Sequence, residues 1–251
     1  MEDLTSDIQA ITQWLREQTE AAGAKGLIVG VSGGLDSAVV AGLIKKAYPQ
    51  DSLGLLLPCH SDPKDVEDGQ LVCKALDLAY HQLDLSGAHD ALFKPALDLL
   101  AGQEIRQMAA DANLRARLRM CALYTIANAL NYLVVGTDNA AEYYTGYFTK
   151  YGDGGCDLLP IAAYTKGEVV QMAHHLGIPP QVIEKAPSAG LWPGQTDEEE
   201  LGLTYAQLDA YLENREVGAA ARQRIERLHL NSQHKRRPPA IYPRPEGPVH
   251  F

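Results

Sequence analysis

The chain has 251 residues, of which 46% are hydrophobic and 22% charged, a composition typical of a globular protein with a well-buried core. A net charge of −10 argues against a broad nucleic-acid-binding face, although a local basic patch is still compatible with it. No segment approaches the length of a membrane span, and the acidic, amphipathic N-terminus does not resemble a signal peptide, so we expect a cytoplasmic protein.

The cysteines and histidines give no sign of a metal or disulfide framework. No two cysteines form a CxxC pair, and the only adjacent histidines are His174 and His175. Structural zinc sites usually show clustered ligands, so this spacing predicts no zinc site. We expect four reduced thiols, at Cys59, Cys73, Cys121 and Cys156.

The first part of the chain alternates helical patterns with short apolar runs. Helical spacing of apolar residues predicts helices over 3–22, 37–47 and 63–79 and a helix-rich region over 88–130, interrupted near Gly102. Four short apolar runs predict buried strands over 26–32, 53–57, 80–85 and 133–135.

This alternation predicts an α/β fold with a doubly wound parallel sheet of about five strands flanked by helices. In such sheets, ligands bind beyond the carboxyl ends of the strands, where the strand order reverses. We therefore expect the functional site in the segments that follow Val31, Leu57 and Val135.

The second part of the chain differs from the first in amino-acid composition. Residues 144–160 are rich in Gly, Tyr and Asp, and residues 186–200 combine Pro and Gly with an acidic run, which is typical of a mobile loop. Residues 236–251 contain five prolines and are expected to form an extended tail. We expect residues 1–251 to form one domain with a helical C-terminal extension.

The strongest local signal is a glycine- and serine-rich loop between a predicted strand and a predicted helix. Its glycines permit close approach of an anion, and the helix N-terminus presents unpaired N–H groups. A carboxylate in such a loop is explained if Asp36 holds Mg²⁺ against phosphate groups. The loop therefore predicts a phosphate-binding site with contacts at Gly30, Val31, Ser32, Gly33, Gly34, Leu35, Asp36 and Ser37.

The loop differs from two common nucleotide-binding motifs. It lacks the Lys of a Walker A loop, and it is not the GxGxxG of dinucleotide-binding folds. The alternative is an ordinary strand-to-helix turn in which Asp36 only favours the helix N-terminus. Because serines flank the glycines on both sides, we favour the phosphate-binding interpretation.

The segment SGGLDS, residues 32–37, resembles the loop of the N-type ATP pyrophosphatases, which cleave ATP between its α and β phosphates. This superfamily includes several amide ligases and tRNA-modifying enzymes, and the loop alone does not distinguish among them. The segment from Gly136 to Pro160, GTDNAAEYYTGYFTKYGDGGCDLLP, resembles the NAD synthetases specifically. The arginine-bearing helix pattern at 113–120 and the KAPS segment at 185–188 follow the same family's order.

This resemblance implies an adenine nucleotide alpha hydrolase-like fold and an ATP-dependent ligase that amidates deamido-NAD with ammonia through an adenylate, giving NAD, AMP and diphosphate. It implies that Asp36 and Glu142 hold Mg²⁺ and that Asp153 and Lys166 are catalytic, with Asp153 receiving ammonium. Further ATP contacts are implied at Leu57, Thr137, Lys166 and Ser188. The deamido-NAD contacts that it implies are Arg117, Tyr124, Tyr147, Lys150, Asp157, Glu200, His234 and Lys235.

One departure from the family pattern concerns the segment after the second strand. Residues 59–62, Cys-His-Ser-Asp, replace an arginine-containing segment of several members, so we expect backbone groups near Leu57 to contact the adenine ring.

The resemblance also implies a homodimer built on the arginine-bearing helix. The acidic charge and the lack of a long apolar segment predict no nucleic-acid or membrane partner. The chain offers no room for the nitrilase-like glutaminase domain of glutamine-dependent members, so free ammonia is the simplest nitrogen source. A separate glutaminase subunit is an alternative that no residue indicates. Two rival functions remain, another ligase or tRNA-modifying enzyme of the same loop class and a non-catalytic adenine-nucleotide sensor.

Overall fold

The structure is a computed structural model that describes residues 4–101, 106–187 and 196–242. Its first part alternates helices and strands, in the order α1 (Thr5–Ala21), β1 (Gly26–Gly30), α2 (Leu35–Ala47), β2 (Ser52–Leu56), α3 (Pro63–Ala75), β3 (Tyr80–Gln82), α4 (Ser86–Asp98), α5 (Gln107–Leu130) and β4 (Tyr132–Val135). Helices follow, namely α6 (Ala140–Thr145), α7 (Lys166–Leu176), α8 (Pro180–Ile183), α9 (Asp197–Leu201), α10 (Tyr205–Leu212), α11 (Ala219–Asn231) and a 3₁₀ turn, η1 (Gln233–Lys235).

The four strands form one parallel sheet in the order β3-β2-β1-β4. In this order the chain moves outward from β1 through β2 to β3, then returns to place β4 on the other side of β1. The point where the strand order reverses therefore lies between β1 and β4, so the segments after these two strands leave the sheet side by side.

The described sheet has four strands, so the prediction of about five was too high. A segment does run beside β4, where Gly136 N–H donates to Leu158 O over 2.8 Å and Val135 forms an isolated parallel bridge with Leu158. Pro160 follows two residues later and has no N–H with which to continue a ladder. This segment consequently occupies the fifth position without becoming a strand.

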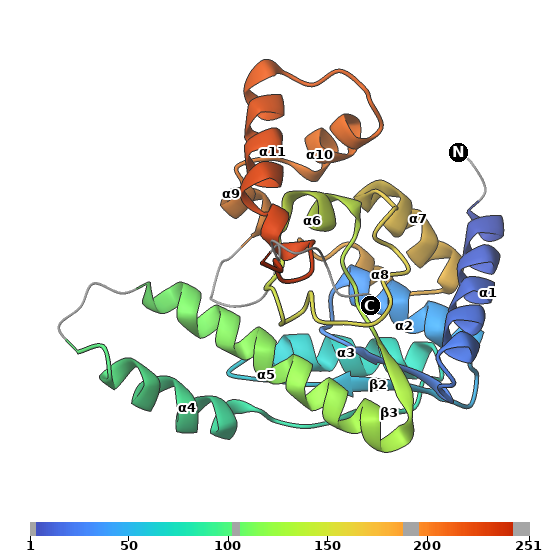
Figure 1. Cartoon of the computed structure of the whole chain (residues 1–251). Helices are drawn as coiled ribbons and strands as arrows, with labels where there is room; N and C mark the ends of the chain where they lie inside the picture. Colours follow the sequence, from blue (N-terminus) through green and yellow to red (C-terminus); the bar gives the residue numbers. More distant parts are fainter. Residues whose placement is uncertain (1–3, 102–105, 188–195, 243–251) are drawn as a thin grey trace.

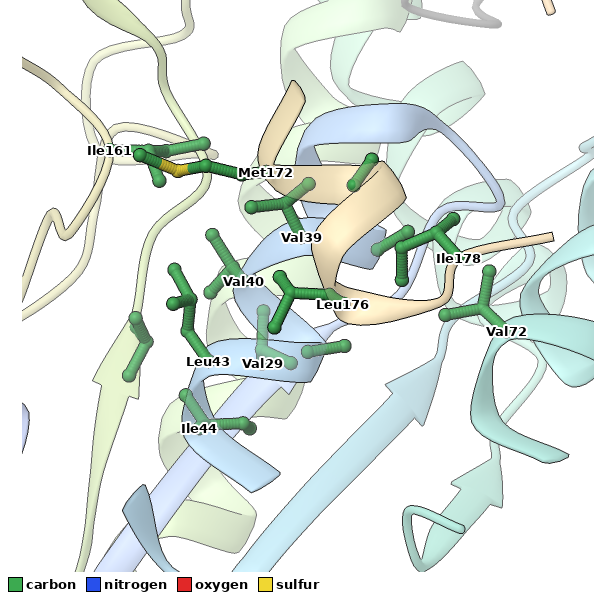
Figure 2. Close-up of a cluster of buried hydrophobic side chains, with 14 of the residues drawn as sticks. Val29, Val39, Val40, Leu43, Ile44, Val72, Ile161, Met172, Leu176 and Ile178 are labelled. Carbon is green, nitrogen blue, oxygen red and sulfur yellow. The ribbon is translucent and has the colours of Figure 1, made fainter. Parts of the chain in front are cut away.

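Helices cover both faces of the sheet (Figure 1). Because strand side chains alternate, Leu27 and Val29 of β1 face α1, α2 and α7, whereas Ile28 faces α5. On the first face, side chains of α2 and α7 interlock above Val29 (Figure 2). No helix in the described ranges is long and apolar enough to cross a membrane.

A third cluster of buried side chains lies outside these two layers. Leu201, Leu203, Leu208 and Ile225 belong to the segments around α9, α10 and α11, and they pack on Ala141 of α6. Figure 1 shows these C-terminal helices on one side of the sheet, next to α6. The C-terminal helices are thereby anchored to the segment that follows β4.

The packing in Figure 2 predicts that truncating a buried leucine costs much more free energy of unfolding than truncating an exposed one. Leu43 in α2 is fully buried, so Leu43→Ala should lower the free energy of unfolding by about 2–5 kcal/mol through lost burial and a residual cavity. Leu230 in α11 is 64% exposed, so Leu230→Ala should change it by less than about 0.5 kcal/mol. Urea unfolding of both variants measures the two costs, and equal costs would contradict the assigned core.

Candidate active site

The loop after β1 is held in shape by its own serines. Ser37 Oγ accepts from Ser32 N–H over 3.1 Å and donates to Gly34 O over 3.0 Å, and Ser32 Oγ accepts from Gly34 N–H over 3.2 Å. Gly34 is the N-cap of α2 and supplies no side-chain bond to the helix N–H groups. The N-terminus of α2 therefore presents donors and the positive end of its dipole, which suits a phosphate group.

Gly33 is required at its position for two reasons. Its φ of 80° lies in the left-handed region that side chains rarely adopt. A Cβ there would also come within 2.3 Å of the Asp65 carbonyl oxygen. The backbone of the loop thus passes directly against α3, and only glycine permits this approach.

Asp36 connects the loop to two distant segments. Its Oδ2 pairs with Lys166 Nζ, and its Oδ1 accepts from Asn139 Nδ2 over 3.1 Å. Both members of the ion pair are largely buried, with side chains 17% and 9% exposed. The structure thus brings together the two predicted ATP-site residues Asp36 and Lys166, which lie on α2 and α7.

Glu142 lies beside this pair because it is the third residue of α6. It closes a capping box in which Glu142 Oε2 accepts from Asn139 N–H over 3.0 Å and Asn139 Oδ1 accepts from Glu142 N–H over 3.1 Å. Burial raises the pKa of Glu142 to about 8, with the Asp36 carboxylate adding to the rise and the Lys166 ammonium opposing it. Two carboxylates and one lysine therefore share a small buried volume.

The donor set in this volume fits Mg²⁺. Asp36 and Glu142 offer carboxylate oxygens, the ligand type that Mg²⁺ prefers, and the Asp36 carboxylate helps to raise the pKa of Glu142. Asp138 adds a buried carboxylate whose Oδ2 has no hydrogen-bond partner in the described part of the chain. Its pKa is raised well above the usual value, first by burial and then by Asp153, Glu142 and Asp36. A bound cation would relieve this accumulation of negative charge.

Lys166 is fixed at the start of α7. Thr165 caps the helix in a capping box with Glu168, and the Lys166 N–H donates to Asp209 Oδ1 over 3.1 Å. Burial alone would lower the pKa of Lys166, but the Asp36 and Glu142 carboxylates raise it. Its ammonium group therefore stays charged in a buried position, as a group that neutralises phosphate should.

A chain of hydroxyls links the acidic cluster to α9. Tyr205 OH lies 3.2 Å from Glu142 Oε1 and 3.1 Å from Asp197 Oδ2. Tyr147 OH lies 3.2 Å from Asp197 Oδ1 and 2.7 Å from Glu200 Oε2. Burial raises the pKa of both tyrosines, so both remain hydroxyl donors. The predicted contacts Tyr147 and Glu200 are thus brought together.

Several predicted deamido-NAD contacts gather around the turn at 146–155. Arg117 Nη2 donates to Lys150 O over 3.3 Å, and Lys150 Nζ donates to His234 O over 2.5 Å. Lys235 Nζ donates to two backbone oxygens of the turn, those of Gly146 and Phe148. The structure thus brings together Arg117, Lys150, His234 and Lys235.

Asp153 is solvent-accessible in the same turn, and its Oδ1 accepts from Thr149 N–H over 2.9 Å. The dense protein around it raises its pKa, against the opposing effect of the Thr149 N–H bond. The nearby Lys235 ammonium also favours the anion. An aspartate in this setting takes up a proton more readily than an ordinary surface aspartate.

Asp157 and Tyr124 form a separate pair. Asp157 Oδ1 accepts from Tyr124 OH over 2.9 Å, and its Oδ2 accepts from Val134 N–H over 2.8 Å. Within the described ranges, no hydrogen bond or ion pair joins this pair to Asp36, Glu142 or Lys166. It lies instead at a cleft of about 460 Å³, whose lining includes Trp14, Asp138, Phe148, Cys156, Asp157 and Lys235.

The remaining predicted ATP contacts are Leu57, Thr137 and Ser188. Leu57 is buried after β2, and its carbonyl oxygen accepts from Arg119 Nε over 3.0 Å. Thr137 follows β4 in the same segment as Asp138. Ser188 lies outside the described residues, as does most of the predicted mobile loop. The ligand contacts of all the predicted residues stay predictions.

Sequence reasoning missed four polar residues of the cluster, namely Asp138, Asn139, Asp197 and Tyr205. The first two directly follow Thr137 at a strand end, so the position rule could have found them. Asp197 stood in a segment interpreted as a mobile acidic loop. Tyr205 lies 63 residues after Glu142, and no local pattern marks it.

The raised pKa of Glu142 predicts how stability depends on pH. Between the ordinary pKa of 4.5 and about 8, the folded protein holds a proton that the unfolded chain has released. Stability of the ligand-free protein should therefore fall as pH rises through this window. Glu142→Gln, which imitates the protonated acid, should show a shallower fall, measured as urea midpoints from about pH 5 to 8.5. Glu20→Gln on the exposed face of α1 is the control, and matching slopes in all three proteins would refute the assignment.

Comparison with known proteins matches this arrangement to one family. The sequence model of NAD synthase matches residues 7–239. The NH(3)-dependent NAD(+) synthetase of Alkaliphilus oremlandii (strain OhILAs) is 53% identical over 242 residues, which cover 95% of this chain and 97% of that protein.

Two solved structures extend the likeness to three dimensions. An NMN synthetase from Francisella tularensis has a TM-score of 0.90 and 36% identity, covering 97% of this chain and 99% of its own. An NH3-dependent NAD synthetase from Campylobacter jejuni has a TM-score of 0.80 and 27% identity, covering 96% and 100%. These likenesses over nearly the whole length of the chain show that it belongs to the NAD synthase family.

Proposed function

We propose that the chain is an ammonia-dependent NAD synthetase that amidates deamido-NAD and cleaves ATP to AMP and diphosphate. The observation that carries this proposal is the cluster of Asp36, Glu142 and Lys166 beside a phosphate-type loop at the carboxyl edge of the sheet. A simple nucleotide sensor has no need for a buried lysine between two carboxylates. An enzyme that separates diphosphate from ATP does need it.

The first step activates a poor electrophile. One oxygen of the nicotinate carboxylate attacks the α-phosphorus of ATP, a new P–O bond forms, and the bond between the α-phosphorus and the bridging oxygen to the β-phosphate breaks. Diphosphate leaves with the electron pair, and a mixed anhydride with AMP remains. The N–H groups at the start of α2 and the Lys166 ammonium stabilise the negative charge that grows on the departing diphosphate.

Asp36 and Glu142 would hold Mg²⁺ in this site, with Asp138 as an additional nearby carboxylate. When bound, the ion would offset phosphate charge and orient the α-phosphate. In the ligand-free chain, Lys166 neutralises Asp36. Binding of the metal nucleotide would exchange this contact for one between Lys166 and the phosphates.

The second step forms the amide. Ammonia attacks the activated carbonyl carbon and a C–N bond forms. The bond from that carbon to the anhydride oxygen breaks, AMP departs with this oxygen and its electron pair, and the new amide nitrogen releases its surplus proton to solvent. Ammonium must lose a proton before it can attack, and we assign the acceptor as Asp153, whose pKa is raised by its surroundings. Arg117, Lys150 and Lys235 provide positive charge around that turn for the substrate's phosphates.

The remaining aspects of the function are proposals of the same kind. We take residues 1–251 to act as one catalytic domain in the cytoplasm, supplied with free ammonia and without a nucleic-acid partner. A separate glutaminase subunit is an alternative source of ammonia. The ATP contact of Ser188, which lies outside the described residues, belongs to the same proposal.

A homodimer is proposed on the basis of α5. This helix has 24 residues, of which only Ala127 is buried within the protomer. Its residues Arg117, Cys121 and Thr125 form an exposed stripe at helical spacing. The neighbouring α4 exposes Leu92, at 50%, and its C-cap residue Leu99 is 84% exposed. A second copy packed on these helices would cover the stripe and place Arg117 at the shared boundary.

A second candidate substrate is nicotinate mononucleotide. The observation that favours it is the similarity to the Francisella tularensis NMN synthetase, with a TM-score of 0.90. Deamido-NAD and the mononucleotide present the same nicotinate carboxylate and differ only in the additional AMP half. The chemistry at Asp36, Lys166 and Asp153 would be identical for both substrates.

The proposed reaction predicts equal amounts of NAD, AMP and diphosphate from Mg-ATP, ammonium and deamido-NAD. Asp36→Asn should reduce the rate on the order of 100-fold or more, because it removes the carboxylate that would hold the metal. Glu20→Gln, distant on α1, should leave the rate unchanged. Product quantification by chromatography measures all three products. AMP formation that does not depend on an acceptor carboxylate would overturn the proposal.

The same assay distinguishes the two substrates. A kcat/KM at least ten-fold higher for deamido-NAD than for nicotinate mononucleotide is expected of an NAD synthetase. The reverse ratio would assign the chain to the second candidate while leaving the adenylation chemistry intact. Activity with neither substrate would refute both.

The proposed interface predicts the mass of the protein in solution. Sedimentation should give about twice the 27.3 kDa of one chain. Cys121→Arg places a charge in the exposed stripe of α5, so it should shift the protein toward monomer. The matched change Gln223→Arg lies on exposed α11 and should not. A wild-type monomer would refute the proposed dimer, and a Cys121→Arg dimer of unchanged stability would place the interface elsewhere.

A further inference from the structure

Three potential metal ligands meet on the loop after β2 and the first turn of α4. His60 Nε2 lies 2.7 Å from Asp90 Oδ1, and His89 Nδ1 lies 3.3 Å from the same oxygen. All three ligand atoms lie within 4.8 Å of one another. His60 and Asp90 are open to solvent, whereas the His89 side chain is only 5% exposed. The group therefore has one buried and two accessible members.

The second ring nitrogen of His89 has a partner of the kind found behind metal ligands. His89 Nε2 lies 2.9 Å from Asp111 Oδ1 on α5, close enough for a hydrogen bond but not aligned as one. Asp111 is itself held by Arg115, whose Nη2 lies 2.6 Å from Asp111 Oδ2. Histidines that bind metals usually direct their other nitrogen to a carboxylate, which fixes the ring and increases its basicity.

The backbone also directs His60 toward this group. His60 has a φ of 52°, in the left-handed region that costs energy for residues other than glycine. Its N–H donates to Ser86 Oγ over 3.0 Å, which ties the loop after β2 to the start of α4. The ring of His89 stacks on Phe93 and meets the ring of His60 edge-on, so packing fixes the orientation of the buried His89 imidazole, against which the more exposed His60 ring lies.

From this geometry we propose that His60, His89 and Asp90 bind a transition-metal cation of the Zn²⁺ type, with Asp111 orienting His89. Two imidazole nitrogens and one carboxylate oxygen are a common ligand set for Zn²⁺, and solvent supplies the fourth ligand. Mg²⁺ is a poor fit because it prefers oxygen ligands. None of the three ligands is among the residues proposed to bind ATP, deamido-NAD or Mg²⁺.

The two ligand separations that involve Asp90 are compatible with entry of such an ion. In a tetrahedral site with bonds of about 2 Å, ligand atoms lie roughly 3.3 Å apart. The His89–Asp90 separation of 3.3 Å already matches, and the His60–Asp90 separation of 2.7 Å must open by roughly 0.6 Å. Because the side chains of His60 and Asp90 are 41% and 64% exposed, this adjustment needs no repacking of the core.

The sequence spacing predicted no zinc site, since the ligands are 29 residues apart and share no motif. The fold brings them together because α4 begins beside the loop that follows β2. A bound ion would fasten this loop to α4. The loop also contacts α5, through the bond from Arg119 Nη2 to Ser61 Oγ over 3.1 Å. The site therefore joins three elements on the α5 side of the sheet.

The test is a competition for Zn²⁺ between the full-length protein and a chromophoric zinc chelator, in excess Mg²⁺. Protein is first stripped with a strong chelator and then freed of it. We expect wild-type protein to keep one equivalent of Zn²⁺ per chain from binding to the chromophoric chelator. His60→Ala and Asp90→Asn, both at exposed side chains, should weaken the affinity at least ten-fold. The control His174→Ala changes an exposed histidine on α7 and should bind like wild type.

A second measurement uses Co²⁺, whose visible absorption is intense only in tetrahedral sites. Wild-type protein and His174→Ala should develop this band, and Asp90→Asn should not. His89→Ala is avoided as the main variant because His89 is buried against Phe93 and the change disturbs packing. The proposal is overturned if wild type leaves Zn²⁺ with the chelator, or if His60→Ala and Asp90→Asn bind it as tightly as wild type.

Discussion

The ion pair between Asp36 and Lys166 is the contact on which the active-site architecture depends. It joins the loop after β1 to the start of α7, and Asn139 extends it to the segment after β4. Removing water from two charges is costly, so such a pair is rarely a net source of stability. Its position is better explained by function, since Lys166 also offsets Glu142, which would otherwise face Asp36 as a second buried carboxylate.

The strand order of the sheet brings the segments that carry Asp36 and Asn139 together. With the order β3-β2-β1-β4, the strand order reverses between β1 and β4, and the phosphate loop and the segment with Asp138 and Asn139 leave the same edge. The α7 helix packs on α2, which places its first residue opposite Asp36. Packing of apolar side chains in Figure 2 therefore determines where the charged groups stand.

Sequence reasoning predicted the fold class, the strand positions and the position of the glycine- and serine-rich loop between β1 and α2, because these depend on local patterns. Alternation of Leu27, Ile28 and Val29 between two helical layers is visible in the sequence as a continuous apolar run. The strand count was too high because the segment beside β4 does not extend its pairing past Leu158. The Asp157 side chain accepts the N–H of Val134, and Pro160 has no N–H to donate. Neither effect leaves a periodic pattern in the sequence. Contacts across 130 residues, such as Lys166 with Asp36, needed a family resemblance or the structure itself.

The most direct test of this account is the Mg²⁺ dependence of binding an ATP analogue that cannot be cleaved between its α and β phosphates. Asp36 is assigned to the metal and Lys166 to the phosphates themselves. In titration calorimetry, Mg²⁺ should therefore strengthen binding to wild type and to Lys166→Met, which binds more weakly overall. For Asp36→Asn, Mg²⁺ should add much less than it adds to wild type. An undiminished Mg²⁺ effect in Asp36→Asn would contradict the central role given to this carboxylate.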